Sequence, residues 1–219
     1  MKNTFRRLGM ALLAACAAGA LLAAPVSARD FRSADIHPGD YPTVEAVKYM
    51  GKLLSERSNG KLGVKVYPNG ALGNERDTIE QIKIGGLDMM RINVAPLNNV
   101  VPESMVVALP FIFRDTDHMH AVLDGPIGDE ILAAMESQGL IGLAFYDSGS
   151  RSLYSKKPVS SLADLKGMKI RVQQSDLFVS MIEALGANPT PMPMGEVYTG
   201  LKTGIVDAAE NNYPSYESS

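Results

Sequence analysis

Arg171 is a charged side chain placed where an anion could bind. It lies in the segment 167–176, in which apolar and polar residues alternate as in a short strand before a helix. In open α/β sheets, ligands bind at the carboxyl ends of the strands. A guanidinium at that place offers a planar fork of donors that matches a carboxylate. An arginine paired with a structural acid is the alternative, and this segment alone leaves both interpretations open.

Other polar groups share this position at the ends of predicted strands. They are Arg91, Asn93, Arg151 and Asn211. Two or three guanidiniums on one rim would repel one another unless an anion joins them, which favours an acidic ligand. Glu75 opens a predicted helix on the same rim, where it could bind sugar hydroxyls or pair with an arginine. His37 follows the first predicted strand and is a further binding candidate.

Metal and covalent chemistry receive little support. His118 and His120 point to different faces of a predicted helix, which is poor geometry for a metal. Residues 148–150 lack the nucleophile elbow, and no phosphate-binding glycine loop is present. We therefore expect a protein without metal or cofactor that is not an enzyme. A secreted enzyme on acidic sugars stays open as an alternative, with Glu75 and Asp147 as the acid/base pair.

Composition and the N-terminal residues predict a secreted globular protein. The chain has 219 residues, 46% of them apolar, and a net charge of −3, so a nucleic-acid partner is not indicated. Residues 1–28 have the cations, the apolar run and the small-x-small site of a signal peptide cleaved after Ala28. The only cysteine, Cys16, also fits a lipid-attachment box, so a lipid-anchored form is the alternative. Later apolar runs are shorter than the roughly 20 residues of a membrane span.

Alternating strands and helices must position the candidate residues. In the first half, the pattern predicts strands over 31–36, 62–66 and 87–93 and a core strand over 140–145. It predicts one helix that begins at Pro42 and is capped by Asp40, and a second that begins at Glu75. The apolar segment over 101–113 is predicted to be buried. After a polar break, it predicts strands over 153–155, 168–172 and 205–209 and helices over 177–185 and 196–202. We expect an α/β protein with a lobe over 29–150, a second over 151–212, and a ligand cleft between them.

Long ordered motifs resemble one protein family. The residues that carry the resemblance are 58–61, 72–73, 109–111, 158–171, 186–189 and 194–211. They resemble the extracytoplasmic solute-binding proteins of TRAP transporters, the tripartite ATP-independent periplasmic systems. The resemblance implies a two-lobed, monomeric periplasmic protein that closes over a carboxylate-bearing solute. It would deliver that solute to the small and large TRAP membrane subunits.

The resemblance also implies roles for single residues. Arg171 matches the arginine that holds the carboxylate, Arg151 the second arginine, and Asn211 the asparagine of the A-E-N segment. The pattern around residues 37–43, 75, 91–93 and 146–151 resembles the subset that binds hexuronates such as glucuronate and galacturonate. His37, Glu75 and Asn93, with Arg91 beside them, would then contact the sugar.

Two alternatives to hexuronate binding remain open. In addition, the sequence departs from the family in one respect. The solute could be another organic acid, such as a C4-dicarboxylate, a keto acid or sialic acid, or the protein could be a ligand sensor for a membrane receptor. Family members continue beyond the A-E-N segment. We therefore expect residues 213–219 to begin the crossover to the first lobe, the C-terminal part of the fold to be absent, and the core of the second lobe to be incomplete.

Overall fold

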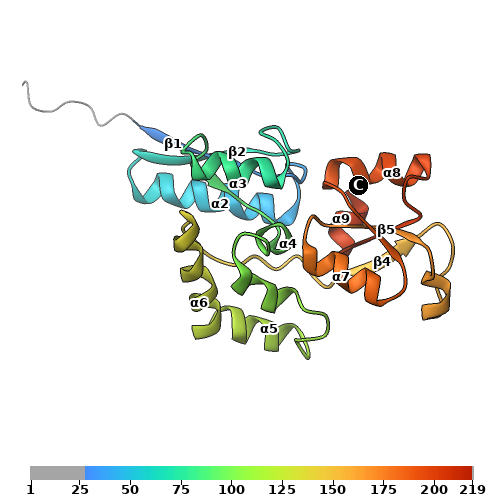
Figure 1. The fold of residues 1–219 in the computed structure, drawn as a ribbon. Helices are drawn as coiled ribbons and strands as arrows, with labels where there is room; N and C mark the ends of the chain where they lie inside the picture. Colours follow the sequence, from blue (N-terminus) through green and yellow to red (C-terminus); the bar gives the residue numbers. More distant parts are fainter. Residues whose placement is uncertain (1–27, 219) are drawn as a thin grey trace, which may run out of the picture.

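Two separate sheets organise residues 28–218, which the computed structural model describes (Figure 1). The first sheet is parallel and has the order β2-β1-β3, formed by β1 (Arg29–Ala34), β2 (Leu62–Tyr67) and β3 (Met89–Met90). The second has the order β4-β7-β5-β6, formed by β4 (Ser152–Ser155), β5 (Lys169–Val172), β6 (Asn188–Pro191) and β7 (Ala208–Asn211). Only β4 runs antiparallel to its neighbour. The predicted α/β class is confirmed.

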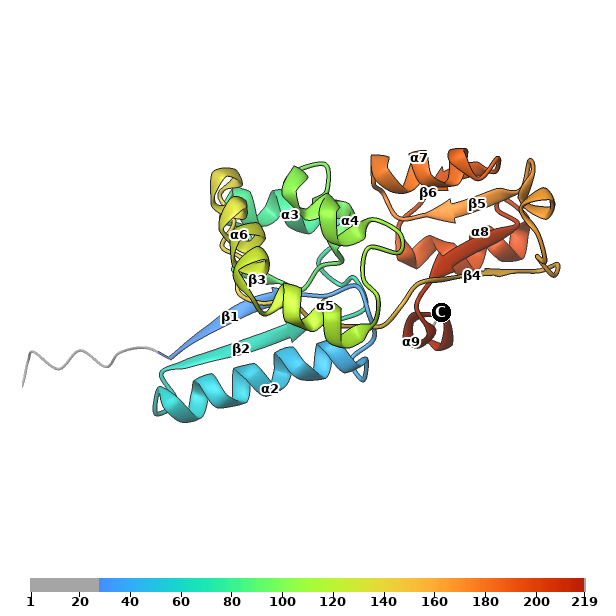
Figure 2. The same ribbon diagram turned by 90° about the horizontal axis from the view of Figure 1, so that it is seen from below.

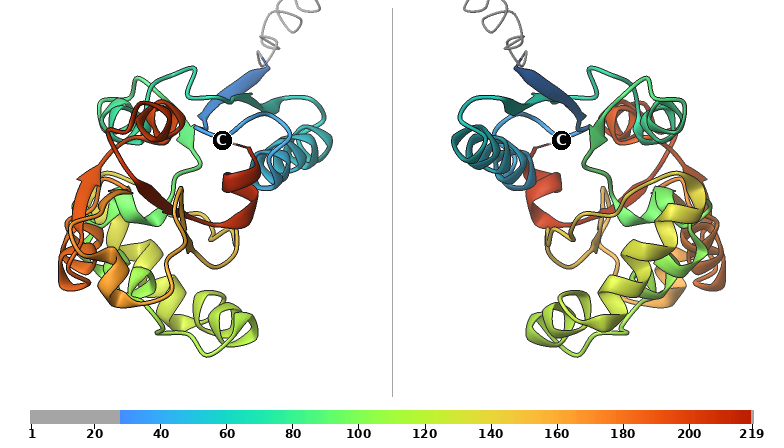
Figure 3. Two further views of the ribbon diagram at one scale, coloured as in Figure 1. Left: turned by 90° about the vertical axis from the view of Figure 1, so that its right-hand side faces the viewer. Right: turned by 90° about the vertical axis from the view of Figure 1, so that its left-hand side faces the viewer.

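Helices cover both faces of each sheet. Those of the first half are α2 (Pro42–Arg57), α3 (Glu75–Lys83), α4 (Val94–Leu97), η1 (Pro102–Ala108), α5 (Thr116–Leu123), α6 (Pro126–Ala134) and η2 (Met135–Gln138). Those of the second half are η3 (Leu162–Leu165), α7 (Asp176–Ala184), η4 (Met194–Glu196) and α8 (Val197–Thr203), and α9 (Tyr213–Glu217) follows β7. Figure 2 shows α2 and α3 on opposite sides of the first sheet. In Figure 3, α9 lies beside α2, so the chain has returned to the first half.

Helix starts follow local capping chemistry. The side chain of Asn74 accepts hydrogen bonds from the backbone nitrogens of Arg76 and Asp77, and Asp77 completes a capping box that makes Glu75 the first residue of α3. The prediction that Asp40 caps α2 is wrong, because Tyr41 is the N-cap residue and makes no side-chain cap. Pro42 fixes the first turn by itself, since it has no N–H to satisfy.

A segment of the first half packs against the second sheet. Ala95 of α4 belongs to the same buried cluster as Ile170, Phe178 and Ile182, and Ala108 packs against that cluster. The amide of Asn98 also donates to the Ser175 hydroxyl at 3.1 Å, and both side chains are buried. The two halves are therefore joined by a packed contact as well as by the chain.

The predicted core strand over 140–145 is wrong. The segment has no regular secondary structure and belongs to neither sheet, and Ile141 and Leu143 are 79% and 66% exposed. A strand needs a neighbour to take its backbone hydrogen bonds, and no described strand lies beside this one. A run of apolar residues therefore does not by itself predict a paired strand.

Two further apolar segments differ from expectation. The strand predicted over 87–93 forms a ladder only at Met89–Met90, because its continuation turns into α4. The segment predicted as buried over 101–113 contains η1 and then an open loop in which Phe111 is fully exposed. We expected an unfilled core in the second half, whereas these exposed apolar side chains lie in the first.

No helix among residues 28–218 is both long enough and apolar enough to cross a membrane. The predicted signal peptide and Cys16 lie outside the described residues, apart from Ala28 itself.

Replacing Gly51 should show how closely α2 packs on β2. A Cβ at Gly51 would lie 2.9 Å from the Cβ of Val64, which is fixed by its strand. We expect Gly51→Val to lower the free energy of unfolding by about 1–3 kcal/mol through overpacking. Lys52→Val places the same side chain on the exposed face of the same helix and should change the free energy of unfolding by only a few tenths of a kcal/mol. Equal denaturation midpoints for the two variants would contradict the close contact between α2 and β2 at Gly51.

Candidate ligand-binding site

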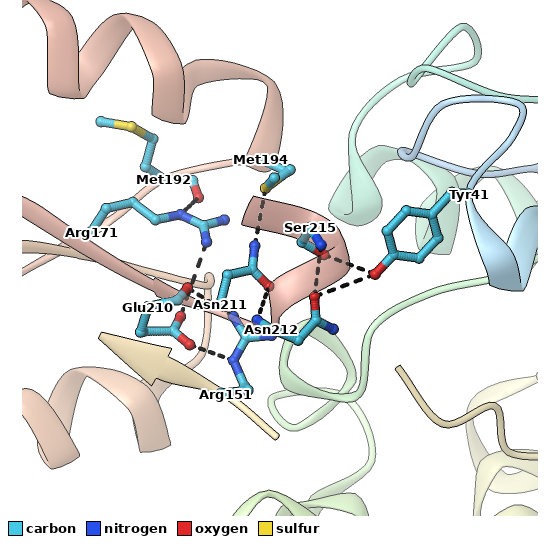
Figure 4. Close-up of polar contacts among 9 residues, drawn as sticks. All are labelled: Tyr41, Arg151, Arg171, Met192, Met194, Glu210, Asn211, Asn212 and Ser215. Atoms are coloured by element: carbon cyan, nitrogen blue, oxygen red, sulfur yellow. Dashed lines mark hydrogen bonds and ion pairs between the residues drawn. The ribbon is translucent and has the colours of Figure 1, made fainter. Parts of the chain in front are cut away.

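The guanidinium of Arg171 is buried and only partly satisfied. Strand β5 buries Ile170 and Val172 in the core and leaves Arg171 2% exposed. Its Nε donates to the backbone oxygen of Met192 at 2.9 Å (Figure 4). Among residues 28–218, its NH1 has no hydrogen-bond partner, and NH1 lies 4.0 Å from Oε1 of Glu210, which also lacks one. Buried polar groups are normally hydrogen-bonded, so Arg171 has donors left for a ligand.

Arg151 is held by protein groups. Its Nε donates to the carboxylate of Glu210, and its NH2 donates to the backbone oxygen of Glu210 at 3.0 Å. With the Gln173 amide turned so that its oxygen accepts, that oxygen lies 2.7 Å from both terminal nitrogens of Arg151. Glu210 therefore lies between the two arginines and pairs with Arg151.

Asn211 ends β7 beside these arginines. It is 6% exposed, its Oδ1 accepts from the backbone nitrogen of Asn212 at 2.9 Å, and its Nδ2 lies 3.4 Å from the sulfur of Met194. A thioether is a weak acceptor, so a ligand oxygen could readily replace it. We call this group of side chains the second-half cluster: Arg151, Arg171, Gln173, Glu210 and Asn211.

Arg91 is paired inside the first half. Its Nε donates to Oδ2 of Asp35 at 2.7 Å, a second nitrogen contacts Oδ1, and NH1 lies 3.4 Å from Oδ1 of Asn93. The Asp35 side chain is 1% exposed and that of Arg91 is 9% exposed. Arg91 is therefore an arginine paired with a structural acid, the alternative that the sequence analysis raised for Arg171.

Glu75 and His37 complete the first-half cluster of Asp35, His37, Glu75, Arg91 and Asn93. Oε1 of Glu75 accepts from the backbone nitrogen of Asn93 at 2.8 Å. Burial raises the pKa of Glu75, although that hydrogen bond, Arg91 and Arg171 oppose the rise. Burial, aided by Arg91, lowers the pKa of His37 to about 4, so the imidazole is neutral at pH 7.

The two clusters act on each other electrostatically. Arg171 of the second half lowers the pKa of Glu75 of the first, and Arg151 lowers that of His37. Opposite charges balance closely, because three arginines are set against three carboxylates. These are Arg91, Arg151 and Arg171 against Asp35, Glu75 and Glu210.

A hollow of about 1410 Å³ opens next to the clusters. Arg91, Asn93, Arg151, Gln173 and Glu210 line it, but most of its wall is apolar, and residues 107–113 and 139–145 contribute to that apolar part. Arg171, Glu75 and His37 are not part of its wall. The polar clusters, and not this apolar hollow, therefore carry the chemistry that could recognise an acid.

Sequence reasoning missed the carboxylates that hold the arginines. Asp35 lies inside the first predicted strand, 31–36, two residues before His37, and Glu210 directly precedes Asn211, so both are close in sequence to residues that were predicted to bind the ligand. Asp147, the proposed partner of Glu75 in an enzyme, instead lies 3.3 Å from the ring of surface His120. No group of three or more metal-ligating side chains occurs within the described part of the chain.

The fold and the site define a class: a two-lobed α/β protein with charged groups facing each other from both lobes, as in solute-binding proteins. The family model of the bacterial extracellular solute-binding proteins, family 7, matches residues 33–219. The chain belongs to this family, which is one of transporter binding proteins and not of enzymes.

Two relatives of known sequence are similar to this chain. A solute-binding protein from Chromohalobacter salexigens is 44% identical over 99% of this chain and 67% of its own length. The 2,3-diketo-L-gulonate-binding periplasmic protein of Escherichia coli is 41% identical over 76% of this chain and 51% of its own.

Solved structures agree with the fold. A TRAP periplasmic solute-binding protein from Bradyrhizobium, in complex with galacturonate, is 77% identical with a TM-score of 0.86, over 87% of this chain and 64% of that one. One from Pseudomonas putida, with bound D-glucuronate, is 47% identical with a TM-score of 0.84, over 87% and 63%. This chain therefore spans about half to two thirds of the length of these relatives.

The neutral state of His37 predicts how stability depends on pH. The unfolded chain binds a proton at His37 near pH 6.5, whereas the folded chain does so near pH 4. The unfolded state binds more protons between these values, so the free energy of unfolding falls as the pH drops through this window, by roughly 3 kcal/mol at most. In His37→Gln this part of the loss should vanish, while His118→Gln, outside the site, should keep it. Parallel curves for wild type and His37→Gln would contradict burial of a neutral imidazole.

Proposed function

We propose that this chain is the solute-binding component of a TRAP transporter and captures a hexuronate by its carboxylate. The observation that carries the proposal is the buried guanidinium of Arg171, whose NH1 has no partner within the described residues. A carboxylate oxygen would complete its hydrogen bonds and strengthen them by charge. The galacturonate and glucuronate complexes of similar proteins support this solute class.

Each half has a separate task in this proposal. Arg171 binds the carboxylate, Arg151 is held beside it by Glu210, and the amide of Asn211 donates a further hydrogen bond. Across the cleft, His37, Glu75 and Asn93 contact sugar hydroxyls, since a neutral imidazole and a carboxylate both accept hydrogen bonds. Arg91 is committed to Asp35 and acts by fixing Asn93.

Charge balance favours a solute with one carboxylate. With Glu75 ionised, the three arginines and three carboxylates sum to zero, and with Glu75 protonated one positive charge remains. Burial raises the pKa of Glu75, although Arg91, Arg171 and the hydrogen bond from the Asn93 backbone oppose the rise, and in either state the site can balance at most one added negative charge. A dicarboxylate would leave a second negative charge unpaired in a buried site, which is costly. A C4-dicarboxylate-binding relative from Rhodobacter capsulatus is 32% identical to this chain, which is a lower identity than that of the two hexuronate-bound structures, 77% and 47%.

The wider context follows from the family. The protein would act as a monomer in the periplasm after cleavage of residues 1–28, and would deliver its solute to the small and large membrane subunits. The lobes would be residues 29–150 and 151–212, with 213–219 leading back to the first. Support comes from the periplasmic relatives and from α9, which lies beside α2.

A ligand panel tests the solute class. The chain from residue 29 should melt at a higher temperature with D-galacturonate or D-glucuronate, because a ligand present at 100 times its Kd adds about 2.7 kcal/mol to the folded state. Succinate, pyruvate, sialic acid and amino acids serve as comparisons. A shift confined to succinate would replace the hexuronate by a dicarboxylate, and turnover of a uronide would favour an enzyme. A cooperative melt that no acid shifts would contradict the proposal.

Variants of Arg171 test the binding mode. Arg171→Ala should weaken hexuronate binding by about 100-fold or more, because each hydrogen bond to a charged group contributes about 1.5–3 kcal/mol. Arg171→Lys should also bind poorly, since an ammonium cannot replace the planar fork. Arg57→Ala, on the exposed end of α2, is the matched control. Near-native affinity of Arg171→Ala by calorimetry would assign the carboxylate to another residue.

A further inference from the structure

We propose that Tyr41 is a positioning residue that couples His37 in the first half to Asn211 in the second. Through this coupling it sets how well the site distinguishes one hexuronate epimer from another. The inference rests on the proposed function for its ligand, but the coupling itself can be measured without one.

The hydroxyl of Tyr41 connects the first half with the end of β7. Tyr41 is 3% exposed, and its OH lies 2.9 Å from Oγ of Ser215 and 3.3 Å from Oδ1 of Asn212 (Figure 4). These partners are 171 and 174 residues away in the sequence. The same Asn212 oxygen accepts from the backbone nitrogen of Ser215 at 3.0 Å, so it also caps α9.

The connection continues into the second-half cluster. The backbone nitrogen of Asn212 donates to Oδ1 of Asn211 at 2.9 Å, which fixes the orientation of that amide. With Oδ1 occupied, Nδ2 of Asn211 is the group that can face a ligand. A shift of Asn212 therefore reorients a proposed ligand-binding amide, although Tyr41 itself does not touch that amide.

The aromatic ring of Tyr41 holds His37. The two rings are stacked with centroids 3.9 Å apart and an angle of 8° between their planes. The loop between them is closed by hydrogen bonds from the backbone nitrogen of Tyr41 to Pro38 at 3.0 Å and from Asn69 to His37 at 2.8 Å. The backbone of His37 is thus fixed by the loop, while its ring orientation depends on the face of Tyr41.

This single side chain therefore links a group expected to contact hydroxyls with a group expected to contact the carboxylate end. Discrimination between epimers requires a defined distance between those groups, because epimers differ in the direction of one hydroxyl. Asn98 and Ser175 provide a second buried link between the halves. Loss of the Tyr41 hydroxyl should consequently loosen the site without separating the halves.

The test uses Tyr41→Phe, which keeps the ring and the stack but removes the hydroxyl. Tyr49→Phe is the control, because Tyr49 lies on α2 with 61% of its surface exposed. By calorimetry, Tyr41→Phe should weaken D-galacturonate and D-glucuronate binding by about tenfold on average, as expected for one or two lost hydrogen bonds, and should change the ratio of the two affinities. Tyr49→Phe should match the wild type.

A measurement without ligand separates this inference from the proposed function. In NMR spectra of the ligand-free protein, the side-chain amide signals of Asn211 should shift in Tyr41→Phe and stay unchanged in Tyr49→Phe. Unshifted Asn211 signals would overturn the coupling, whether or not a hexuronate binds. Shifted signals with an unchanged affinity ratio would overturn the role in discrimination. Absence of hexuronate binding in the wild type would contradict the proposed function and leave the NMR result to decide the coupling.

Discussion

The candidate site depends on how the fold pairs the positive charges of its buried and partly buried arginines. Three arginines lie at the ends of strands, and two of them are satisfied by acids of the protein, Arg91 by Asp35 and Arg151 by Glu210. Arg171 keeps a buried nitrogen without a partner in the part of the chain that the structure describes. Leaving a buried charge incompletely hydrogen-bonded is costly, and that cost would be recovered if an anion bound there, as proposed. In the proposed site, one arginine is thus available to the solute and the other two are neutralised by the protein's own acids.

Coupling between the halves follows from where the buried polar links lie. Tyr41 contacts the β7–α9 junction, and Asn98 contacts the start of α7. Each link joins a residue at the end of a first-half helix to the N-terminal end of a helix that follows a strand of the second sheet, α9 after β7 and α7 after β5. Because both involve buried hydrogen bonds, they are stronger than exposed contacts and specific in direction. The relative position of the two clusters is therefore controlled by few side chains.

The first half exposes several large apolar side chains to solvent. Phe111 is fully exposed, Ile141 and Leu143 are largely so, and the segment that contains the latter two pairs with no strand that the structure describes. Apolar surface of this extent is usually covered in soluble proteins. The chain covers 64% of the similar Bradyrhizobium chain, so the wall of the hollow is described here without the remainder found in that relative.

The sequence by itself determined the α/β class and most helix and strand positions, because periodicity and capping are local properties. The family followed from the resemblance of its long motifs and not from periodicity. It also placed Arg171 on the strand before α7. Only the tertiary structure decided which arginines are already paired, since Asp35 and Glu210 reach them across 56 and 59 residues. It likewise decided that residues 140–145 form no ladder and that Tyr41 connects the halves. Strand pairing and salt-bridge choice depend on neighbours distant in the chain, which local patterns do not specify.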